Sequence, residues 1–497
     1  MFTRRVAALL LFLLVLSASA ACSAQKPEES GEITGEAPVV GDDAETSAEE
    51  TTVDPASLLS LENRDFNGAD FTIAYINWAL YNGYIISEEE SGDTVNDAVF
   101  RRTLLCEEKA NVKLHMTDLG TIFDIEPKIS KSVMAGDDAY QLVLVHCVGG
   151  VSSLAAEGLV ENWNDIPNVD FTKKWWKSAA NKNLSVGGIQ THVSSEFIRS
   201  DVVALLFNPG MVSDYSLDDP YKLVFDGKWT WDRLGSMSKA VVLDTNGDGI
   251  MDEQDQYGFV GARTWEIVSV PYSCGQLIIE NDGVMPRLVF NNEKTASIVK
   301  MFYDLLYDGQ NRAFTWISSA ATDPNLGGTP PVDFGAGHAL FYLLPLTSLP
   351  NYRKTEIDFG ILPLPKYDEQ QENYLSLDWG GLMCVPRGAN KDLAGYVTEL
   401  LSYYSMETTV PAWYDIMLTG KIARDDNTVR VLDIIYSNVV YDFGLNYAEG
   451  YNKMQNAMYE VVNFKQGDFA SFYAAEESRA IEYYNGVCEA ILEKYGG

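Results

Sequence analysis

The chain has 497 residues, with 71 Asp and Glu against 36 Lys and Arg, so its formal net charge is -35 at pH 7. Such a charge repels nucleic-acid phosphates and anionic lipid headgroups, which excludes both as expected partners. Hydrophobic residues make up 46% of the chain and include 27 Tyr, 21 Phe and 10 Trp, enough for a large core.

The N-terminus has the pattern of an export signal that ends at a lipid-attachment site. Two arginines precede an apolar run too short to span about 30 Å of hydrocarbon, and small residues then lead to Cys22. This order resembles a lipobox, although Ser19 stands where Leu or Val is usual. We expect residues 1–21 to be removed and Cys22 to carry lipid; the alternative is ordinary secretory cleavage after Ala21.

Residues 22–64 are predicted to form an acidic, lipid-anchored tether. As far as about residue 57 this stretch is rich in Glu, Asp, Ser, Thr, Pro and Gly, with almost no large apolar side chains. Such a composition cannot bury enough surface to offset chain entropy, so the segment is expected to be disordered. A self-repelling tether of this kind holds a folded domain away from a surface.

The folded part opens with strands that alternate with helices. A β-rich run at residues 71–76 ends in Asn77-Trp78, and a helix is expected from Asp93 onward. A strand at 111–116, a helix at 122–136 and a strand at 140–146 follow. This alternation predicts an α/β fold with a parallel, doubly wound sheet, where ligands bind beyond the carboxyl ends of the strands. Asn77-Trp78 and His146-Cys147 are therefore expected at one rim.

The second half of the chain has a more helical texture. Residues 202–208 are an unbroken apolar run typical of a buried strand, and two β-like passages follow at 359–365 and 379–386. Helices are expected at 231–242, at 293–307 and from residue 393 onward. After removal of the leader and tether, roughly 430 residues remain, which is the size of two or three domains.

The segment 244–255 has the spacing of a calcium-binding loop. Oxygen side chains at loop positions 1, 3, 5, 9 and 12, with Gly at position 6, suit an ion coordinated by about seven oxygens. Position 12 is Asp instead of Glu, as in dockerin-type loops. We expect one structural Ca²⁺; a solvated Asp/Gly turn is the alternative. The predicted ligands, including one backbone carbonyl, are Asp244, Asn246, Asp248, Ile250, Asp252 and Asp255.

Cysteine and histidine patterns favour no metal or redox chemistry. Five cysteines follow Cys22, none has CxxC spacing, and most lie in apolar surroundings, so they are predicted to be buried thiols. The four histidines have no zinc-ligand spacing. There is no GxSxG, HExxH or phosphate-binding glycine loop. The five cysteines are Cys106, Cys147, Cys274, Cys384 and Cys488.

Tryptophans supply the main functional indication. Several are expected at element ends or in loops, and sugar rings stack their C–H faces on such aromatic planes. Any single Trp can instead be a core residue. The tryptophans expected at such positions are Trp78, Trp175, Trp176, Trp265, Trp316, Trp379 and Trp413.

Several short segments, in this order along the chain, resemble the family 1 extracellular solute-binding proteins of ABC importers. They include residues 92–99, 140–145, 334–341, 359–368 and 410–415. Each segment alone has low specificity, and their order carries the resemblance. It implies the maltose-binding-protein-like architecture: two α/β lobes of the type II periplasmic-binding-protein fold, joined by crossing hinge strands.

The resemblance also implies domain boundaries. The first crossing is expected near residues 201–208 and the second near 341–346. The N-terminal lobe would comprise residues 65–203 plus 347–395, and the C-terminal lobe residues 204–346 plus 396–497.

The implied function is capture of a carbohydrate, in particular an oligosaccharide, for an ABC permease, with no bond broken. Asp201 matches an acidic ligand-binding position of the family and Trp413 an aromatic one. The chain is expected to be a monomer at the extracytoplasmic face of the membrane, held there through its lipid alone. A surface glycoside hydrolase or lyase, or a non-transport adhesion or sensing lipoprotein, are the alternatives. The predicted ligand-binding residues are Asn77, Trp78, Asp201, Trp265, Trp379, Trp413 and Tyr414.

Overall fold

The computed structural model describes residues 59–496, apart from 79, 82, 263–264, 310–312, 317–333, 353–354 and 418–425. The predicted signal peptide, the lipidation site Cys22 and the tether up to residue 58 lie outside the described residues. Residues Leu59–Gly497 cluster as one unit through their internal contacts. Across the described ranges, no helix is both long enough and apolar enough to cross a membrane.

The first sheet contains four strands in the order β12-β3-β1-β2. β1 runs parallel to β2 and to β3, whereas β12 runs antiparallel to β3. Phe71 and Ile73 of β1 are fully buried, as the apolar pattern of this run predicts. The predicted parallel core is therefore confirmed. The bounds are β1 (Ala69–Tyr75), β2 (Val112–Asp118), β3 (Leu142–Val145) and β12 (Leu382–Cys384).

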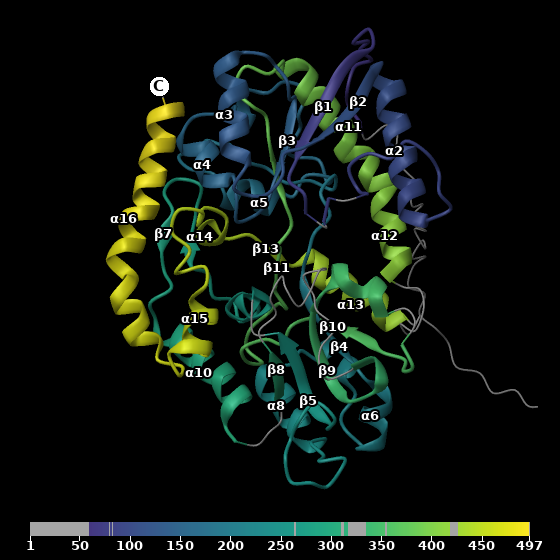
Figure 1. Cartoon of the computed structure of the whole chain (residues 1–497), viewed down its shortest axis with the longest axis vertical. Coiled ribbons are helices and arrows are strands. Elements are labelled where there is room, and N and C mark those ends of the chain that lie inside the picture. Colours follow the sequence, from purple (N-terminus) through teal and green to yellow (C-terminus); the bar gives the residue numbers. More distant parts are fainter. Residues whose placement is uncertain are drawn as a thin grey trace, which may run out of the picture. The chain divides into compact units, whose positions relative to one another are not determined.

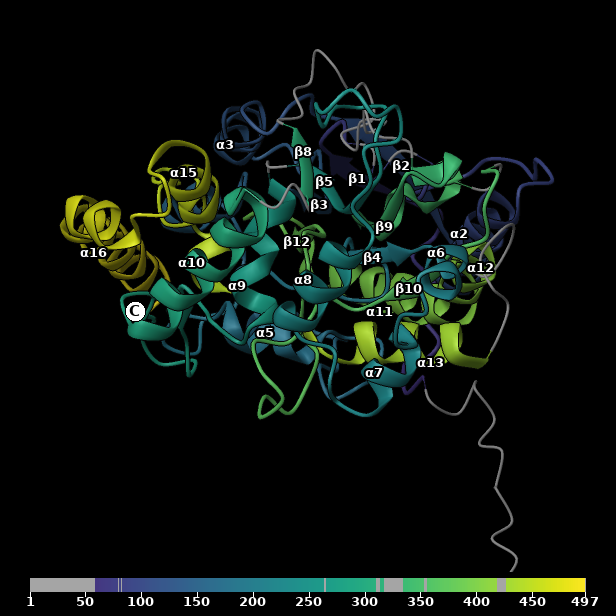
Figure 2. The same cartoon turned by 90° about the horizontal axis from the view of Figure 1, so that it is seen from below.

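Helices cover both sides of this sheet, with α2 and α3 on opposite sides of β1 (Figures 1 and 2). Asp93 caps α2 by accepting two backbone N–H bonds from the first turn, as its position predicts. Gly136 ends α3 with a φ of 61°, a left-handed conformation that glycine adopts without strain. α11 and α12 pack against α2. The bounds are α2 (Thr94–Ala110), α3 (Ile125–Ala135), α11 (Lys391–Glu407) and α12 (Thr409–Met417).

The second sheet contains five strands in the order β10-β4-β9-β5-β8. β5 runs parallel to β9 and β8, while β4 runs antiparallel to β9 and β10. α8 approaches β5 closely because Gly258 has no side chain; a Cβ there would lie 2.1 Å from Ser238 Cα. The bounds are β4 (Val203–Phe207), β5 (Tyr257–Ala262), β8 (Ala313–Trp316), β9 (Ala339–Pro345), β10 (Gly360–Leu362), α8 (Trp231–Ala240) and α10 (Glu293–Tyr307).

Two segments of chain cross between the sheets and pair with each other. The first lies immediately before β4, where the sequence predicts it. Val202 forms a bridge with Asp378, the N–H of Asp201 donates to Asp378 Oδ1 at 2.9 Å, and the N–H of Trp379 donates to the Asp201 carbonyl at 2.9 Å. The side chain of Asp378 therefore ties one crossing segment to the other.

The second crossing lies later in the chain than the sequence predicted. β9, expected to cross near 341–346, pairs with β4 and β5 inside the second sheet, and β10 returns to β4. The chain reaches the first sheet only at β12. The predicted boundaries at 346–347 and 395–396 therefore need correction, because β10 belongs to the second sheet and α12 packs beside the first. A buried apolar run indicates a buried strand but not its pairing partner.

Shorter elements and the C-terminal helices complete the described fold. α16 contacts α4 as well as α10 and α15, and so runs beside elements attached to both sheets (Figure 1). The further elements are α4 (Val151–Ala156), η1 (Trp163–Asp165), α5 (Ser178–Asn183), α6 (Pro209–Asp214), α7 (Pro220–Phe225), η2 (Trp265–Val268), α9 (Ser269–Ser273), β6 (Ile279–Glu280), β7 (Arg287–Leu288), η3 (Phe334–Ala336), η4 (Leu346–Tyr352), β11 (Ser376–Leu377), α13 (Asp426–Ser437), β13 (Val439–Val440), α14 (Phe443–Asn446), α15 (Ala457–Phe464) and α16 (Phe469–Tyr495).

The five cysteines of the folded part are free thiols, and all of them are buried. Burial raises the pKa of each thiol above its usual range, which suits side chains that act as small hydrophobic groups. The predicted role as buried thiols is confirmed. They are Cys106, Cys147, Cys274, Cys384 and Cys488.

Candidate ligand-binding site

A cavity of about 450 Å³ lies where strand ends of the two sheets meet. We call it the first cavity. Its walls come from the segments that follow β1, β3, β5 and β9 and from both crossing segments, the place where parallel strands present ligand-binding groups. Its lining residues are Trp78, Leu80, Tyr84, His146, Val148, Arg199, Asp201, Trp265, Pro345, Thr347, Ser348, Asn351, Trp379, Gln455 and Asn456.

Three indole rings form the apolar walls of the first cavity. The ring of Trp78 lies 4.0 Å from that of His146, which confirms the prediction that the ends of β1 and β3 share one rim. Trp265 meets Trp379 edge to face, with ring centroids 5.5 Å apart. Trp379 is only 4% exposed, and its Nε1–H donates to Ser269 Oγ at 3.1 Å. The indole plane of Trp379 is thus held in place before any ligand enters.

Asp201 supplies the carboxylate of the first cavity. It is 5% exposed, and Thr347 Oγ1 donates to its Oδ1 at 2.6 Å. The backbone of Thr347 also hydrogen-bonds to this carboxylate. Burial raises the pKa of this carboxyl group to about 6, although the Thr347 hydrogen bond and Arg199 oppose the rise. At pH 7 Asp201 is therefore mostly ionised, and a carboxylate can accept further hydrogen bonds beyond those from Thr347.

His146 contributes a hydrogen-bond donor to the same cavity. The backbone N–H of Val148 donates to His146 Nδ1 at 3.1 Å, so the proton of the neutral ring belongs on Nε2. Burial lowers the pKa of the imidazole to about 4. The ring is therefore neutral at pH 7, with an N–H to offer. Asp201 and His146 together provide one acceptor and one donor beside the indoles, which suits a hydroxyl-rich ligand.

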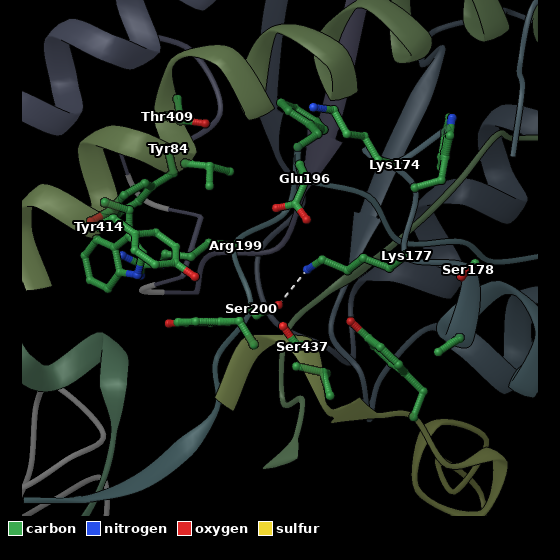
Figure 3. Close-up of a pocket in the computed structure, with 18 of the residues that line it drawn as sticks. Tyr84, Lys174, Lys177, Ser178, Glu196, Arg199, Ser200, Thr409, Tyr414 and Ser437 are labelled. Carbon is green, nitrogen blue, oxygen red and sulfur yellow. Dashed lines mark hydrogen bonds between the residues drawn. The ribbon is translucent and has the colours of Figure 1, made fainter. Parts of the chain in front are cut away.

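A second cavity, of about 440 Å³, adjoins the first and shares Tyr84 and Arg199 with it (Figure 3). Its lining combines aromatic rings with basic side chains. In Figure 3 the carboxylate of Glu196 and the amino group of Lys177 face the same central space. The lining residues are Tyr84, Arg102, Lys174, Trp176, Lys177, Ser178, Ala179, Glu196, Phe197, Arg199, Ser200, Thr409, Val410, Trp413, Tyr414, Tyr436, Ser437, Val439 and Tyr441.

Arg199 stands between the two cavities. Its guanidinium carbon lies 3.9 Å from the centre of the Tyr84 ring and 4.3 Å from that of Trp413. Such cation–π contacts favour a fixed position for the guanidinium group. Within the described chain, no group accepts a hydrogen bond from Arg199, and its Nε is buried.

Beneath both cavities, Asp378 holds the crossing segments and Lys177. The Asp378 carboxylate accepts hydrogen bonds from the N–H of Asp201, from the N–H of Gly380 at 2.6 Å and from Tyr441 Oη at 2.6 Å. Lys177 Nζ lies 3.7 Å from it and donates to Ser200 Oγ at 2.7 Å. One buried carboxylate thus positions groups that face each cavity.

The predicted ligand-binding residues divide into three sets. Trp78, Asp201, Trp265 and Trp379 come together in the first cavity, and Trp413 and Tyr414 line the second. Asn77 lines neither cavity: it is exposed, and its Nδ2 donates to Asp118 Oδ2 at 3.0 Å. Sequence reasoning placed His146 at the rim but not in the site. It missed Arg199, Thr347 and Asn351 entirely.

The predicted calcium loop is described, and its carboxylates accept backbone hydrogen bonds. Asp244 accepts from the N–H groups of Gly247 and Gly249, and Asp255 accepts from Thr245 and Asp252. In the described ranges, no three His, Cys, Asp or Glu side chains are grouped to hold a metal ion. The Ca²⁺ site therefore stays a prediction.

Neither a protein-family model nor a curated protein sequence matches the chain. Solved structures do. The chain is similar to the galacto-N-biose-/lacto-N-biose I-binding protein of the ABC transporter from Bifidobacterium longum in complex with lacto-N-biose (TM-score 0.56, 13% identity, covering 84% of this chain and 98% of that one). It is also similar to UgpB from Mycobacterium tuberculosis in complex with glycerophosphocholine (0.56, 12%, 84% and 98%).

A third similar structure is a cyclo/maltodextrin-binding protein complexed with maltotetraose (TM-score 0.52, 16% identity, covering 86% of this chain and 98% of that one). Each likeness spans almost the whole of the other protein and more than four-fifths of this chain. At these identities it establishes architecture. The predicted fold class is confirmed: the chain has the two-lobed α/β fold of the solute-binding proteins of ABC transporters.

Proposed function

We propose that this chain is an extracytoplasmic solute-binding lipoprotein that captures a carbohydrate in the first cavity and delivers it to an ABC permease. The observation that carries the proposal is the pairing of indole planes with the carboxylate of Asp201 in one cavity. Indoles stack on the C–H faces of a sugar ring, and a carboxylate accepts hydrogen bonds from its hydroxyls. The similar structures are solute-binding proteins of the same fold, several of them with bound saccharides.

The chemistry of the first cavity favours binding over hydrolysis. Glycoside hydrolases use two carboxyl groups, one on each side of the bond that breaks. Among the described residues of this lining, Asp201 is the only carboxylate. A receptor needs no second one, because closure of the lobes around the ligand is the signal that a permease can read.

Isothermal titration calorimetry of the purified chain against a panel of oligosaccharides, amino acids and short peptides tests the proposal. We expect binding to one or more saccharides, with no release of shorter products on prolonged incubation. Binding to peptides or amino acids alone would overturn the carbohydrate assignment. Release of shortened glycans, abolished by removal of carboxylates but with binding retained, would favour the hydrolase alternative.

Anchoring is proposed on the sequence alone. Cys22 would carry the lipid, and the acidic segment after it would keep the folded part clear of the membrane. Cells fed radiolabelled palmitate are expected to label the wild-type chain and not a Cys22→Ser variant. Labelling of both would remove Cys22 as the lipidation site. Co-purification of a permease with the wild-type chain would distinguish transport from an adhesion role.

A further inference from the structure

The second cavity reverses the charge balance of the protein. In the whole chain acidic residues outnumber basic ones by 71 to 36. Among the charged residues that line the second cavity, four are basic and only Glu196 is acidic. A local excess of positive charge in a strongly acidic protein concentrates anions at that place. The basic residues are Arg102, Lys174, Lys177 and Arg199.

Two of these four cations are occupied by the protein itself. Arg102 is 1% exposed and donates to the carbonyls of Tyr84 and Ile85. Lys177 donates to Ser200 and lies beside the Asp378 carboxylate. These two side chains hold the wall of the cavity together and are not free to bind a ligand.

The other two cations have no acceptor within the described chain. Lys174 is exposed and forms no ion pair, and Arg199 donates no hydrogen bond although its Nε is buried. A half-buried guanidinium group without an acceptor forgoes strong charge-assisted hydrogen bonds. Tyr84 and Trp413 fix its position, so a planar anion could bind it without a search through rotamers.

Resting on the proposed function, we infer that the natural ligand is an acidic oligosaccharide. Its anionic group, a carboxylate or a sulfate ester, binds in the second cavity to Arg199 and Lys174. A neighbouring sugar ring lies against Trp265 and Trp379 in the first cavity. One ligand can contact both cavities because Arg199 lines both of them. The carboxylate of Glu196, which accepts no hydrogen bond from any described residue, accepts ring hydroxyls.

Calorimetry of the full chain with matched saccharides tests the inference. Trisaccharides of galacturonate, glucuronate and mannuronate are each compared with the neutral hexose trisaccharide of the same linkage, and a sulfated galactose trisaccharide forms a further arm. We expect at least one anionic probe to bind about tenfold more tightly than its neutral counterpart, and added NaCl to reduce that difference. The arm that binds identifies the anionic group as carboxylate or sulfate.

Two variants locate the anionic group. Lys174→Gln changes an exposed side chain. It is expected to weaken binding of the anionic probe about threefold to tenfold and to leave binding of the neutral probe unchanged. Arg199→Gln should have a larger effect in the same direction. Lys300→Gln is the matched control, because Lys300 is also exposed but lies on α10, away from both cavities.

The possible outcomes distinguish failure of the acidic-ligand inference from failure of the proposed function. Equal binding of neutral and anionic probes, or equal weakening of both by Lys174→Gln and Arg199→Gln, overturns the acidic ligand and leaves the saccharide receptor standing. Tighter binding of the neutral probes does the same. If no saccharide of either class binds, both proposals fail together.

Discussion

The two cavities have almost the same volume, about 450 and 440 Å³, and Arg199 lines both, but the rest of their linings differ in chemistry. The first has three indoles, a carboxylate and a neutral imidazole. The second has aromatic rings among cations, two of which lack an acceptor in the described chain. Size therefore does not distinguish them, and the difference lies in the number of basic side chains in the lining, which is four in the second cavity and one in the first. We expect the first cavity to hold sugar rings and the second to select for charge.

The largest effect is expected from Asp378, which supports both cavities at once. Asp378→Ala leaves Lys177 without its buried counter-ion and the donors of Gly380 and Tyr441 without their acceptor, so the free energy of unfolding should fall by about 3–5 kcal/mol. Urea denaturation measures the loss. Asp378→Asn, which keeps the shape and one acceptor oxygen, should cost less. A loss below about 1 kcal/mol for Asp378→Ala would mean that the cavities are held independently.

The second-largest effect is expected on ligand affinity, where replacement of Trp265 and of Trp413 should have different consequences. Trp265→Ala removes an indole face from the first cavity and should weaken binding of any saccharide by about 1–3 kcal/mol. Trp413→Ala removes a ring that contacts Arg199, so we expect it to weaken anionic saccharides more than neutral ones. Calorimetry with both probes measures the two effects. Phe464→Ala, at an exposed aromatic residue outside both cavities, is the control. Identical profiles for the two Trp variants would contradict the division of roles.

Acidification should weaken saccharide binding in the first cavity, because Asp201 becomes protonated. Its carboxyl group has a pKa of about 6, and it must be ionised to accept from hydroxyls on both oxygens, so affinity should fall about tenfold between pH 7 and pH 5. Asp201→Asn should bind weakly and lose that part of the pH dependence. A wild-type affinity for neutral saccharides that does not change over this range would remove Asp201 from the site.

The loss of saccharide affinity at low pH is distinct from the effect of Asp201 on the stability of the fold. Because the pKa of Asp201 is higher in the folded chain than its ordinary 3.8, the folded state binds more protons between about pH 4 and pH 6. This group therefore stabilises the fold as the pH falls through that window, while ligand binding is lost. Thermal melts at each pH separate the two trends.

The sequence predicts local structure well because its signals are local. Asp93 and Gly136 bound their helices through backbone groups a few residues away, and α10 has the predicted bounds. The rim shared by Trp78 and His146 follows from two parallel strands, a rule that needs no atomic detail. Four of the seven predicted ligand-binding residues come together for the same reason: they lie at strand ends or on a crossing segment.

What the sequence could not predict depends on partners distant in the chain. Arg199 acquires its position from Tyr84 and Trp413, and no spacing rule connects those residues. Trp175 and Trp176 are among the tryptophans expected at element ends or in loops as candidates for a ligand, yet both indole N–H groups donate to the buried carboxylate of Glu399. The second crossing was misplaced for the same reason, since strand pairing is set by tertiary contacts.

The smallest expected effect concerns residues 244–255, which line neither cavity. If this loop binds Ca²⁺, the ion should stabilise the chain without changing saccharide affinity in either cavity. Calcium at five times its dissociation constant would add about 1 kcal/mol to the free energy of unfolding. Differential scanning fluorimetry with CaCl₂ and with MgCl₂ measures the shift in melting temperature. Mg²⁺ should cause a smaller shift, because it tolerates only near-octahedral geometry.

Asp248→Ala should abolish the shift with Ca²⁺, since Asp248 is a predicted ligand. Among the described residues, its carboxylate accepts only the N–H of Ile250. An unchanged melting temperature with Ca²⁺ would leave the segment as a turn held by its own backbone hydrogen bonds, and a change in sugar affinity would show that the loop is coupled to the cavities after all.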